Sequence, residues 1–396
     1  MAERAPILVL NQISAQGLSR LPVESYRVGK DVSDPVALLL RSADLHSQTI
    51  PASVKAIGRA GAGTNNIPVA LMSQRGVPVF NAPGANANAV KELVLAGMLM
   101  AARQLAPAMQ FVAALDPHSS DLDKQVENGK KAYGGYEIAG QTLGIVGLGK
   151  IGCLVADAAI KLGLDVLGYD PDITVDAAWS LPAQVKRAGS VNEVLRQAQF
   201  VTLHVPLVDA TRGLVNNANI GLMRPGAVLM NFSRDGIVDN AAVIEALEAK
   251  RLGSYVCDFP EPELMGKAGV IALPHLGAST REAEENCAVM VVDQLRDYLE
   301  HGQVVNAVNF PTVSMARESA WRLAIANSNV PNMLGQISTA MADAGLNIHN
   351  MVNKSRGDMA YTLVDVDSAV DEAVIAKLAA ITGVLSVRYL PTRPAG

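Results

Sequence analysis

The feature that most constrains the fold is a glycine-rich turn between an apolar strand and an amphipathic helix. Residues 147–152 have the sequence GLGKIG and directly follow the apolar segment 143–146. In the segment 150–162, apolar residues recur at i, i+3, i+4, i+7 and i+8, and Gly163 follows as a stop. A further apolar segment ends at Asp170, about 20 residues after the turn. This strand–turn–helix–strand order predicts a parallel α/β unit.

The same turn predicts a nucleotide site. Gly147, Gly149 and Gly152 would let a pyrophosphate approach the backbone, and the free N–H groups of the helix N-terminus would face its charge. Asp170 would accept hydrogen bonds from the ribose hydroxyls. A 2′-phosphate would meet this carboxylate, and Pro171 and Asp172 supply no arginine, so NAD is favoured over NADP.

Alternation of strand and helix patterns extends over most of the 396 residues. Strands are expected at 7–10, 36–40, 54–57 and 77–80, and again at 143–146, 165–170, 200–205, 228–232, 255–258 and 270–273. Helices are expected at 67–74, 88–105 and 150–162, and after the capping boxes that begin at Ser190 and Ser279. Such alternation predicts two doubly wound parallel sheets, a flavodoxin-like one and a Rossmann one.

The C-terminal part has a different order of elements. Strands are expected at 321–326, 349–353, 360–366 and 384–389, with helices at 333–344 and 371–381. This is the βαββαβ order of a ferredoxin-like domain. The expected domains are therefore 1–95 with 277–305, 96–276, a linker at 306–319, and 320–396.

Composition excludes several classes of protein. A net charge of −5 and an isoelectric point of about 5.7 argue against a nucleic-acid binder or a polybasic membrane anchor. Cys153, Cys257 and Cys287 are too few and too scattered for a disulfide framework or a metal site. The longest apolar run, 93–102, is too short to span a bilayer, and the N-terminus lacks a signal-peptide layout. We expect a cytoplasmic protein without a metal.

Three polar clusters follow expected strands, at the edge where parallel sheets bind ligands. They place Arg234, Glu261 and His275 at successive strand ends. Taken singly, these residues have simpler interpretations as a surface ion-pair partner, a loop carboxylate and a turn residue. Together, and after a nucleotide motif, an arginine, a carboxylate and a histidine indicate hydride-transfer chemistry on a small acid.

These motifs resemble those of the D-isomer-specific 2-hydroxyacid dehydrogenases over essentially the whole chain. The resemblance rests on GLGKIG with Asp170, NFSRDGIVDN, DFPEPEL and PHLGAST, together with the loops at 58–66 and 79–84. The chain departs from the family where DFPEP stands in place of the usual D-V-F-x-x-E-P. The loop before Glu261 is therefore shorter than in the family.

The resemblance implies roles for particular residues. Arg234 would bind the substrate carboxylate, His275 would exchange the hydroxyl proton, and Glu261 would hold the second nitrogen of His275. The implied cofactor residues are Gly147, Gly149, Lys150, Ile151, Gly152, Asp170, Val205, Pro206, Thr211, Phe232, Ser233, Arg234, Asp258, His275, Gly277 and Ala278. The implied substrate residues are Arg59, Ala60, Gly61, Asn86, Arg234 and His275, with Arg59 as the main candidate for binding a phosphate and Arg75, Asn86 and Lys91 as weaker ones.

The implied activity is NAD-dependent oxidation of 3-phospho-D-glycerate to 3-phosphohydroxypyruvate, the first step of serine biosynthesis. The alternatives are a dehydrogenase of glycerate, lactate or 2-hydroxyglutarate, or a non-catalytic sensor of NAD or amino acids. The C-terminal part resembles ACT domains, with serine as the implied effector at Asn327, Asn329 and Asn347. Many family members have Gly where Asn332 stands. The resemblance also implies a homodimer or homotetramer.

Overall fold

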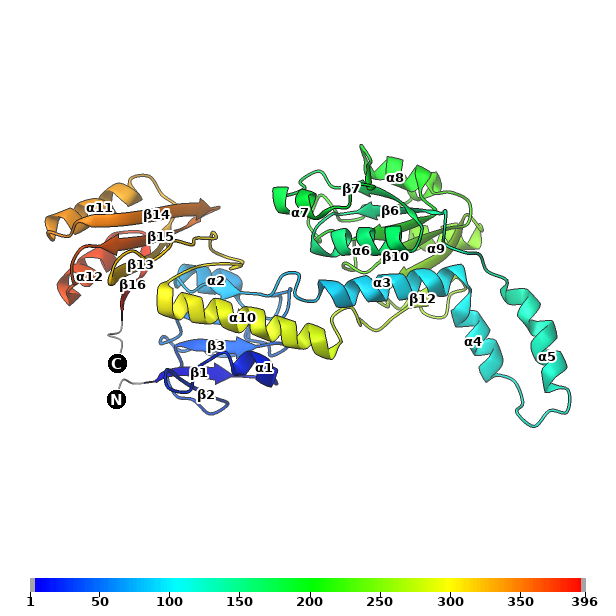
Figure 1. Cartoon of the computed structure of the whole chain (residues 1–396), viewed down its shortest axis with the longest axis horizontal. Helices are drawn as coiled ribbons and strands as arrows, with labels where there is room; N and C mark the ends of the chain where they lie inside the picture. The colour runs from blue at the N-terminus through cyan, green and yellow to red at the C-terminus, as the bar shows by residue number, and fades with distance from the viewer. Residues whose placement is uncertain (1–3, 393–396) are drawn as a thin grey trace. The chain divides into compact units, whose positions relative to one another are not determined.

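The computed structural model describes residues 4–392, which divide into two compact units. The first unit joins the chain up to Asn86 with the chain from Arg281 onward, and the second is Ala87–Thr280. Figure 1 shows the elements of each unit. The expected division into three domains and a linker stays a prediction at this level.

A five-stranded parallel sheet forms the N-terminal part of the first unit. Its strands are β1 (Ala5–Val9), β2 (Tyr26–Gly29), β3 (Ala37–Leu40), β4 (Ala56–Arg59) and β5 (Val79–Phe80), in the order β2-β1-β3-β4-β5. All four residues of β3 are buried, as parallel strands covered on both faces require. This order confirms the flavodoxin-like prediction, although β2 and the short helix α1 (Ala15–Leu18) were not expected from the sequence.

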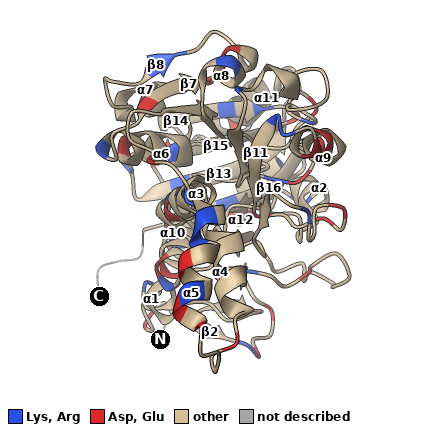
Figure 2. Cartoon of the chain, turned by 90° about the vertical axis from the view of Figure 1, so that its right-hand side faces the viewer, with Lys and Arg blue, Asp and Glu red and all other residues tan. Residues whose placement is uncertain are grey.

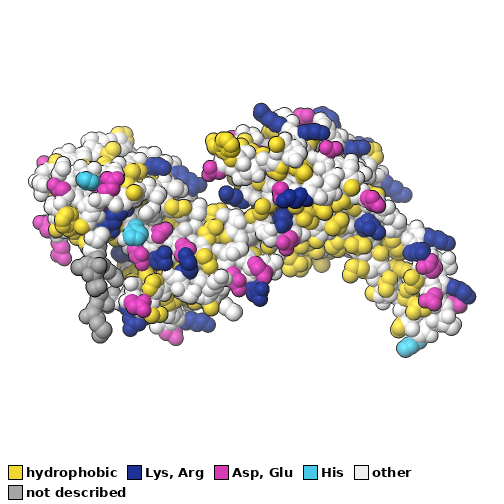
Figure 3. Space-filling view, in the orientation of Figure 1, with side chains coloured by type: hydrophobic (Ala, Val, Ile, Leu, Met, Phe, Trp, Pro, Cys, Tyr) yellow, Lys and Arg dark blue, Asp and Glu magenta, His cyan; other side chains and the backbone are white. Residues whose placement is uncertain are grey.

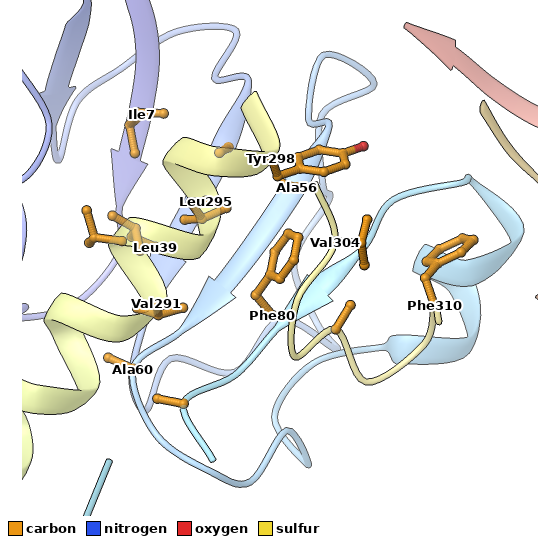
Figure 4. Packing of buried hydrophobic residues seen from close by; sticks show 14 of the residues in the cluster. Ile7, Leu39, Ala56, Ala60, Phe80, Val291, Leu295, Tyr298, Val304 and Phe310 are labelled. Atoms are coloured by element: carbon orange, nitrogen blue, oxygen red, sulfur yellow. The ribbon is translucent and has the colours of Figure 1, made fainter. Parts of the chain in front are cut away.

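The 21-residue helix α10 (Arg281–His301) covers one face of this sheet. Val291 and Leu295 of α10 lie over Ile7 and Leu39, as Figure 4 shows. A Cβ at Gly58 would lie 2.6 Å from Cδ1 of Leu295, so the helix can pack this closely only over a glycine. The other face of the sheet is lined by a second apolar cluster beneath helix α2 (Val69–Gln74).

The second unit contains a seven-stranded parallel sheet. Its strands are β6 (Thr142–Val146), β7 (Asp165–Tyr169), β8 (Lys186–Arg187), β9 (Phe200–Leu203), β10 (Ala227–Asn231), β11 (Leu252–Cys257) and β12 (Val270–Ala272). Its helices are α3 (Ala87–Ala102), α6 (Lys150–Lys161), α7 (Val175–Ser180), α8 (Val191–Gln197) and α9 (Asn240–Glu248). The strand order β12-β11-β10-β9-β6-β7-β8 reverses direction between β6 and β9. This is the Rossmann order, and it confirms the predicted fold class.

Helix ends in this unit follow local sequence signals. Oγ of Ser190 accepts a hydrogen bond from the backbone N–H of Glu193 at 3.2 Å, as the capping box predicts. The Glu193 carboxylate, however, accepts from the N–H of Gly189 at 2.7 Å, one residue earlier than the box implies. Helix α3 ends at Ala102, before the expected Leu105, and Gln104 then adopts a φ of +49°.

An excursion of two helices follows α3. Helix α4 (Leu105–Ala113) and helix α5 (Leu122–Gly129) contain no buried residue, and a 3₁₀ turn at Lys130–Tyr133 leads back to the sheet. Figure 2 shows charges of both signs on α5. These helices were not expected from the sequence.

The C-terminal part of the first unit is a four-stranded antiparallel sheet with two helices. Its elements are β13 (Trp321–Ser328), α11 (Met333–Asp343), β14 (Ile348–Arg356), β15 (Met359–Val366), α12 (Glu372–Ala379) and β16 (Val384–Pro391). The order β14-β15-β13-β16 confirms the ferredoxin-like prediction. Its helices enclose one apolar cluster, whereas Ala324, Tyr361 and Leu363 on the other face join the core beneath α10.

No helix in the part of the chain that the structure describes is long and apolar enough to cross a membrane.

Candidate functional site

The glycine turn lies between β6 and the start of α6. Gly147 has a φ of +94°, and a Cβ there would lie 2.4 Å from the carbonyl oxygen of His204. A Cβ at Gly152 would lie 2.1 Å from the carbonyl oxygen of Gly147, so neither position accepts a side chain. A Cβ at Gly149 would meet nothing within 4 Å. The turn thus packs tightly against its own sheet and is open at its tip, where the N-terminus of α6 begins.

Asp170 connects this turn to the end of β7. Its Oδ2 accepts a hydrogen bond from the N–H of Leu148 at 2.8 Å, and its Oδ1 accepts from Asp172 at 3.0 Å. Each carboxylate oxygen has a second lone-pair position for a hydroxyl donor. The open turn, the α6 N-terminus and this half-buried carboxylate fit a dinucleotide whose ribose carries free hydroxyls.

His204 directly follows β9, the strand that neighbours β6 across the reversal point, and the sequence patterns did not single it out. Its Nε2 lies 3.0 Å from Oγ1 of Thr202, and its Nδ1 is buried without a hydrogen-bond partner among residues 4–392. Burial lowers the pKa of His204 to about 3, so the ring is neutral at physiological pH. Next along the chain, Oγ1 of Thr211 donates to the carbonyl of Pro206 and closes a turn that holds Val205 and Pro206 at the strand end.

Arg234 follows β10 on a loop held by buried groups. Phe232 is buried, the Ser233 hydroxyl donates to the carbonyl of Leu203 at 2.6 Å, and Asn231 donates to the carbonyl of Arg234 at 2.8 Å. The Arg234 side chain itself is exposed, and one of its terminal nitrogens donates to the carbonyl of Ser233 at 2.6 Å. The loop backbone is therefore anchored, while most of the guanidinium donors remain available.

Asp258, at the end of β11, organises the loop that carries His275. Its carboxylate is 1% exposed and accepts hydrogen bonds from the N–H groups of Leu276 and Gly277 at 2.7 and 2.8 Å. Burial raises the pKa of Asp258, and these two donors oppose the rise. His275 has a φ of +55°, which is uncommon for a residue with a side chain and marks a locally strained backbone.

Glu261 and His275 are not in contact in this structure. The Glu261 carboxylate accepts a hydrogen bond from Nδ2 of Asn240 at 2.7 Å, and the exposed His275 ring lies against Phe259 with centroids 4.9 Å apart. No hydrogen bond or ion pair joins the two residues within 4–392. Burial and the nearby Glu263 carboxylate raise the pKa of Glu261. Asn240 ends the motif NFSRDGIVDN, but the sequence assigned it no role in the site, because only the fold brings α9 beside this loop.

Four expected substrate residues lie in the first unit. Arg59 ends β4, and its Nε donates to the carbonyl of Arg41 at 3.0 Å. Its guanidinium lies directly over Gly61, where a Cβ would be 2.1 Å from an Arg59 nitrogen. Ala60 is buried between them, and Asn86 is half-buried at the end of the segment. Gly61 is therefore required for the position of Arg59.

The expected effector residues lie at both ends of α11: Asn327 and Asn329 precede the helix, whereas Asn347 follows it, next to the start of β14. Asn327 is buried, with an Oδ1 that has no hydrogen-bond partner in the described chain. Nδ2 of Asn329 donates to the carbonyl of Gly357 at 3.0 Å, and the N–H of Asn347 donates to Asp367 at 3.1 Å. Asn332 has a φ of +63°, which explains the family's glycine at this position, since Gly and Asn are the residues that tolerate it best.

Within residues 4–392, no group of three His, Cys, Asp or Glu side chains could hold a metal ion. The polar groups at the ends of β6, β7, β9, β10 and β11 suit an organic cofactor and substrate. They can bind phosphates and hydroxyls through backbone N–H groups and Asp170, bind an acid through Arg234, and exchange a proton through His275.

Known proteins are similar to this chain over most of its length. Residues 95–278 match the family described as "D-isomer specific 2-hydroxyacid dehydrogenase, NAD binding domain". A D-3-phosphoglycerate dehydrogenase of Haemophilus influenzae is 32% identical over 360 residues, which cover 87% of this chain and 84% of the relative. The D-3-phosphoglycerate dehydrogenase of Escherichia coli K12 is 32% identical over 348 residues, covering 85% and 81%. That of Methanocaldococcus jannaschii is 33% identical, and the match spans only 54% of its length.

Solved structures share the fold of a large part of the chain. The TT0316 protein of Thermus thermophilus has a TM-score of 0.61 at 26% identity and covers 76% of this chain and 99% of its own. An NAD⁺-bound 3-phosphoglycerate dehydrogenase of Entamoeba histolytica has a TM-score of 0.59 at 23% identity, covering 77% and 99%.

Proposed function

The chain belongs to the D-isomer-specific 2-hydroxyacid dehydrogenases, and we propose that its substrate within that family is 3-phospho-D-glycerate. It is an NAD-dependent enzyme of 2-hydroxy acids. The choice of substrate rests on relatives named D-3-phosphoglycerate dehydrogenase. Their sequences are about one third identical to this chain over more than four fifths of their own length. The product is 3-phosphohydroxypyruvate, and the reaction opens serine biosynthesis.

The proposed mechanism assigns one task to each side chain. NAD, when bound, supplies the acceptor for the hydride that leaves C2 of the substrate. Arg234 binds the substrate carboxylate through its free guanidinium donors and orients C2. His275 takes the proton of the C2 hydroxyl and returns it in the reverse direction. The raised pKa of Glu261 suits a carboxyl group that shares a proton with a histidine.

In this proposal Glu261 must exchange Asn240 for His275 as its partner. This exchange would break one hydrogen bond of 2.7 Å from the Asn240 amide to Glu261. It would form a charge-assisted hydrogen bond from an imidazolium, which is the stronger of the two. Asp258 keeps the backbone of His275 in place meanwhile, through its bonds to Leu276 and Gly277. For the substrate phosphate we propose Arg59, which is preoriented by Arg41 and Gly61.

The test is oxidation of NADH by the full chain with 3-phosphohydroxypyruvate, compared with hydroxypyruvate, pyruvate and 2-oxoglutarate. We expect the phosphorylated oxo acid to have the highest kcat/KM. His275→Ala should lower kcat by about 10²–10⁴-fold while NADH binding stays nearly unchanged. Preference for an unphosphorylated oxo acid would reassign the enzyme within its family, and near-normal turnover of His275→Ala would remove the histidine from the mechanism.

We further propose that serine binds between two paired copies of the C-terminal domain, at Asn327, Asn329 and Asn347, and inhibits the enzyme. The buried and unsatisfied Oδ1 of Asn327 is the polar atom that supports a ligand there. Calorimetry with serine on the full chain should show binding at millimolar concentrations or below. An Asn329→Ala variant should lose both this heat and the inhibition of NADH oxidation, whereas absence of heat from the unchanged chain would leave the domain with an assembly role.

A homo-oligomer formed through α4 is the proposed assembly. Leu105, Met109 and Val112 lie on this helix with exposed fractions of 41, 67 and 58%. Apolar side chains are visible on the surface of this excursion in Figure 3. Residues at this spacing form one stripe of a helix, and a stripe this exposed is typical of a protein interface. Met109→Glu should shift the sedimentation of the protein towards the monomer, and an unchanged mass would exclude α4 as the interface.

A further inference from the structure

A cavity of about 710 Å³ lies in the first unit, away from every site described above. Three parts of the unit contribute to its wall: the N-terminal ends of strands β1 to β4, the C-terminal end of α10, and strand β16 with the segment before β13. Neither NAD residues nor the proposed serine residues line it. Its volume lies within the range of small-molecule sites in proteins.

Three cations line this cavity. Lys55, Arg317 and Arg388 contribute to its wall, and within residues 4–392 none of them forms an ion pair with an acid. The acid of the cavity, Glu300, is already engaged, because it accepts a hydrogen bond from the Tyr26 hydroxyl at 2.8 Å and lies 3.8 Å from the His301 ring. In a chain with a net charge of −5, three cations without acid partners around one cavity create a local positive field.

The two arginines are held in fixed positions. Arg388 donates to the carbonyls of Tyr298 and Leu299 at 2.9 Å each, and its guanidinium carbon lies 4.3 Å from the centroid of the Tyr298 ring. Arg317 donates to the carbonyls of Ser319 and Ala320 at 2.9 and 3.0 Å and also to the carbonyl of Leu390, so its Nη1 donors remain. Guanidinium groups held in this way lose little entropy when they bind a ligand.

Capping of α10 explains only part of this arrangement. Arg388 satisfies carbonyls at the helix C-terminus, where a cation is favourable. Arg317 instead contacts carbonyls outside the helix, and burial together with the charge of Arg322 lowers its pKa. The ammonium group of Lys55 makes no hydrogen bond or ion pair within the described chain. An anion in the cavity would provide the missing partner for both.

We propose that this cavity binds a small organic anion that carries carboxylate or phosphate groups. The ligand would contact Lys55 and the remaining donors of Arg317 and Arg388. Because Arg388 also holds the last carbonyls of α10, the ligand would bind at the junction between that helix and the C-terminal sheet.

Calorimetry on the full chain saturated with NADH tests the proposal, with citrate as the carboxylate probe and pyrophosphate as the phosphate probe. We expect one site per chain for at least one probe, and the probe that binds identifies the anionic group. Lys55→Glu should weaken binding about tenfold. Lys354→Glu is the matched control and should leave binding unchanged. Lys354 is an exposed lysine on β14, which forms the edge of the C-terminal sheet opposite to β16.

Two further variants separate this site from the proposed active site and from misfolding. Arg234→Ala should leave binding of the probe intact, since Arg234 belongs to the second unit. Lys55→Gln removes the charge without introducing an acid and should also weaken binding. It therefore tests the site even if Lys55→Glu fails to fold. Equal affinity of the unchanged chain and both Lys55 variants, loss of binding in Arg234→Ala, or absence of heat with both probes would overturn the proposal.

Discussion

Replacing Arg322 by methionine should destabilise the first unit more than any single surface change. Arg322 and Asp365 are both 0% exposed, and two bonds join them, at 2.6 and 2.9 Å. The same guanidinium donates to the carbonyls of His301, Met315 and Ala316 at 3.2, 3.2 and 2.9 Å. Arg322→Met would therefore leave a buried carboxylate without its cation and three carbonyls without their donor.

The expected loss is about 3–5 kcal/mol in the free energy of unfolding, which is the usual cost of removing one partner from a buried ion pair. A loss of about 4 kcal/mol lowers the ratio of folded to unfolded molecules close to a thousandfold. The double variant Arg322→Met with Asp365→Leu removes the stranded charge together with its partner. It should recover more than half of the loss, because well-packed apolar residues replace such pairs at little cost.

Trp321 provides the assay. It lies next to Arg322 against the core of the C-terminal sheet, and the only other tryptophan is Trp179 in the second unit. In a Trp179→Phe background, denaturant unfolding followed by tryptophan fluorescence therefore reports on this sheet. A loss below about 1 kcal/mol for Arg322→Met would refute the reasoning, since it would show that water reaches the carboxylate. A double variant as unstable as the single one would refute the stranded-charge explanation.

Two further predictions concern the turn of the NAD site and the effect of pH. Gly152→Ala should weaken NADH binding by about tenfold or more, measured by NADH fluorescence, because its Cβ would lie 2.1 Å from the Gly147 carbonyl oxygen. Gly134→Ala, outside the turn and with nothing within 4 Å of the added Cβ, is the control and should stay within about twofold. Burial opposes the ionisation of Asp365, yet Arg322 and the N–H of Glu318 hold its pKa below the ordinary value. The stability from Asp365 should therefore be complete above about pH 4 and decline as pH falls through the lowered pKa, and Asp365→Asn should remove that decline in acid unfolding curves.

Local sequence signals were sufficient for the second unit's nucleotide turn. Gly147 and Gly152 are glycines because a side chain would collide with backbone atoms, and such a steric rule is visible in a short stretch of sequence. The parallel α/β class of the first two sheets followed from the alternation of strand and helix patterns. Their strand orders, and the strands β2 and β8, came only from the structure. Helices α4 and α5 were missed, although α4 carries Leu105, Met109 and Val112 at helical spacing, and neither helix contains a buried residue.

The sequence by itself determined the type of each of the three sheets and the glycine turn with Asp170. It also determined that Arg234, Glu261 and His275 follow the ends of strands. Only the tertiary structure decided which side chains meet. It pairs Glu261 with Asn240 and places Asp258 beneath the His275 loop. The physical reason is that periodicity and turn chemistry act over a few residues. The partner of a buried or charged group, by contrast, is set by contacts between segments far apart in the chain.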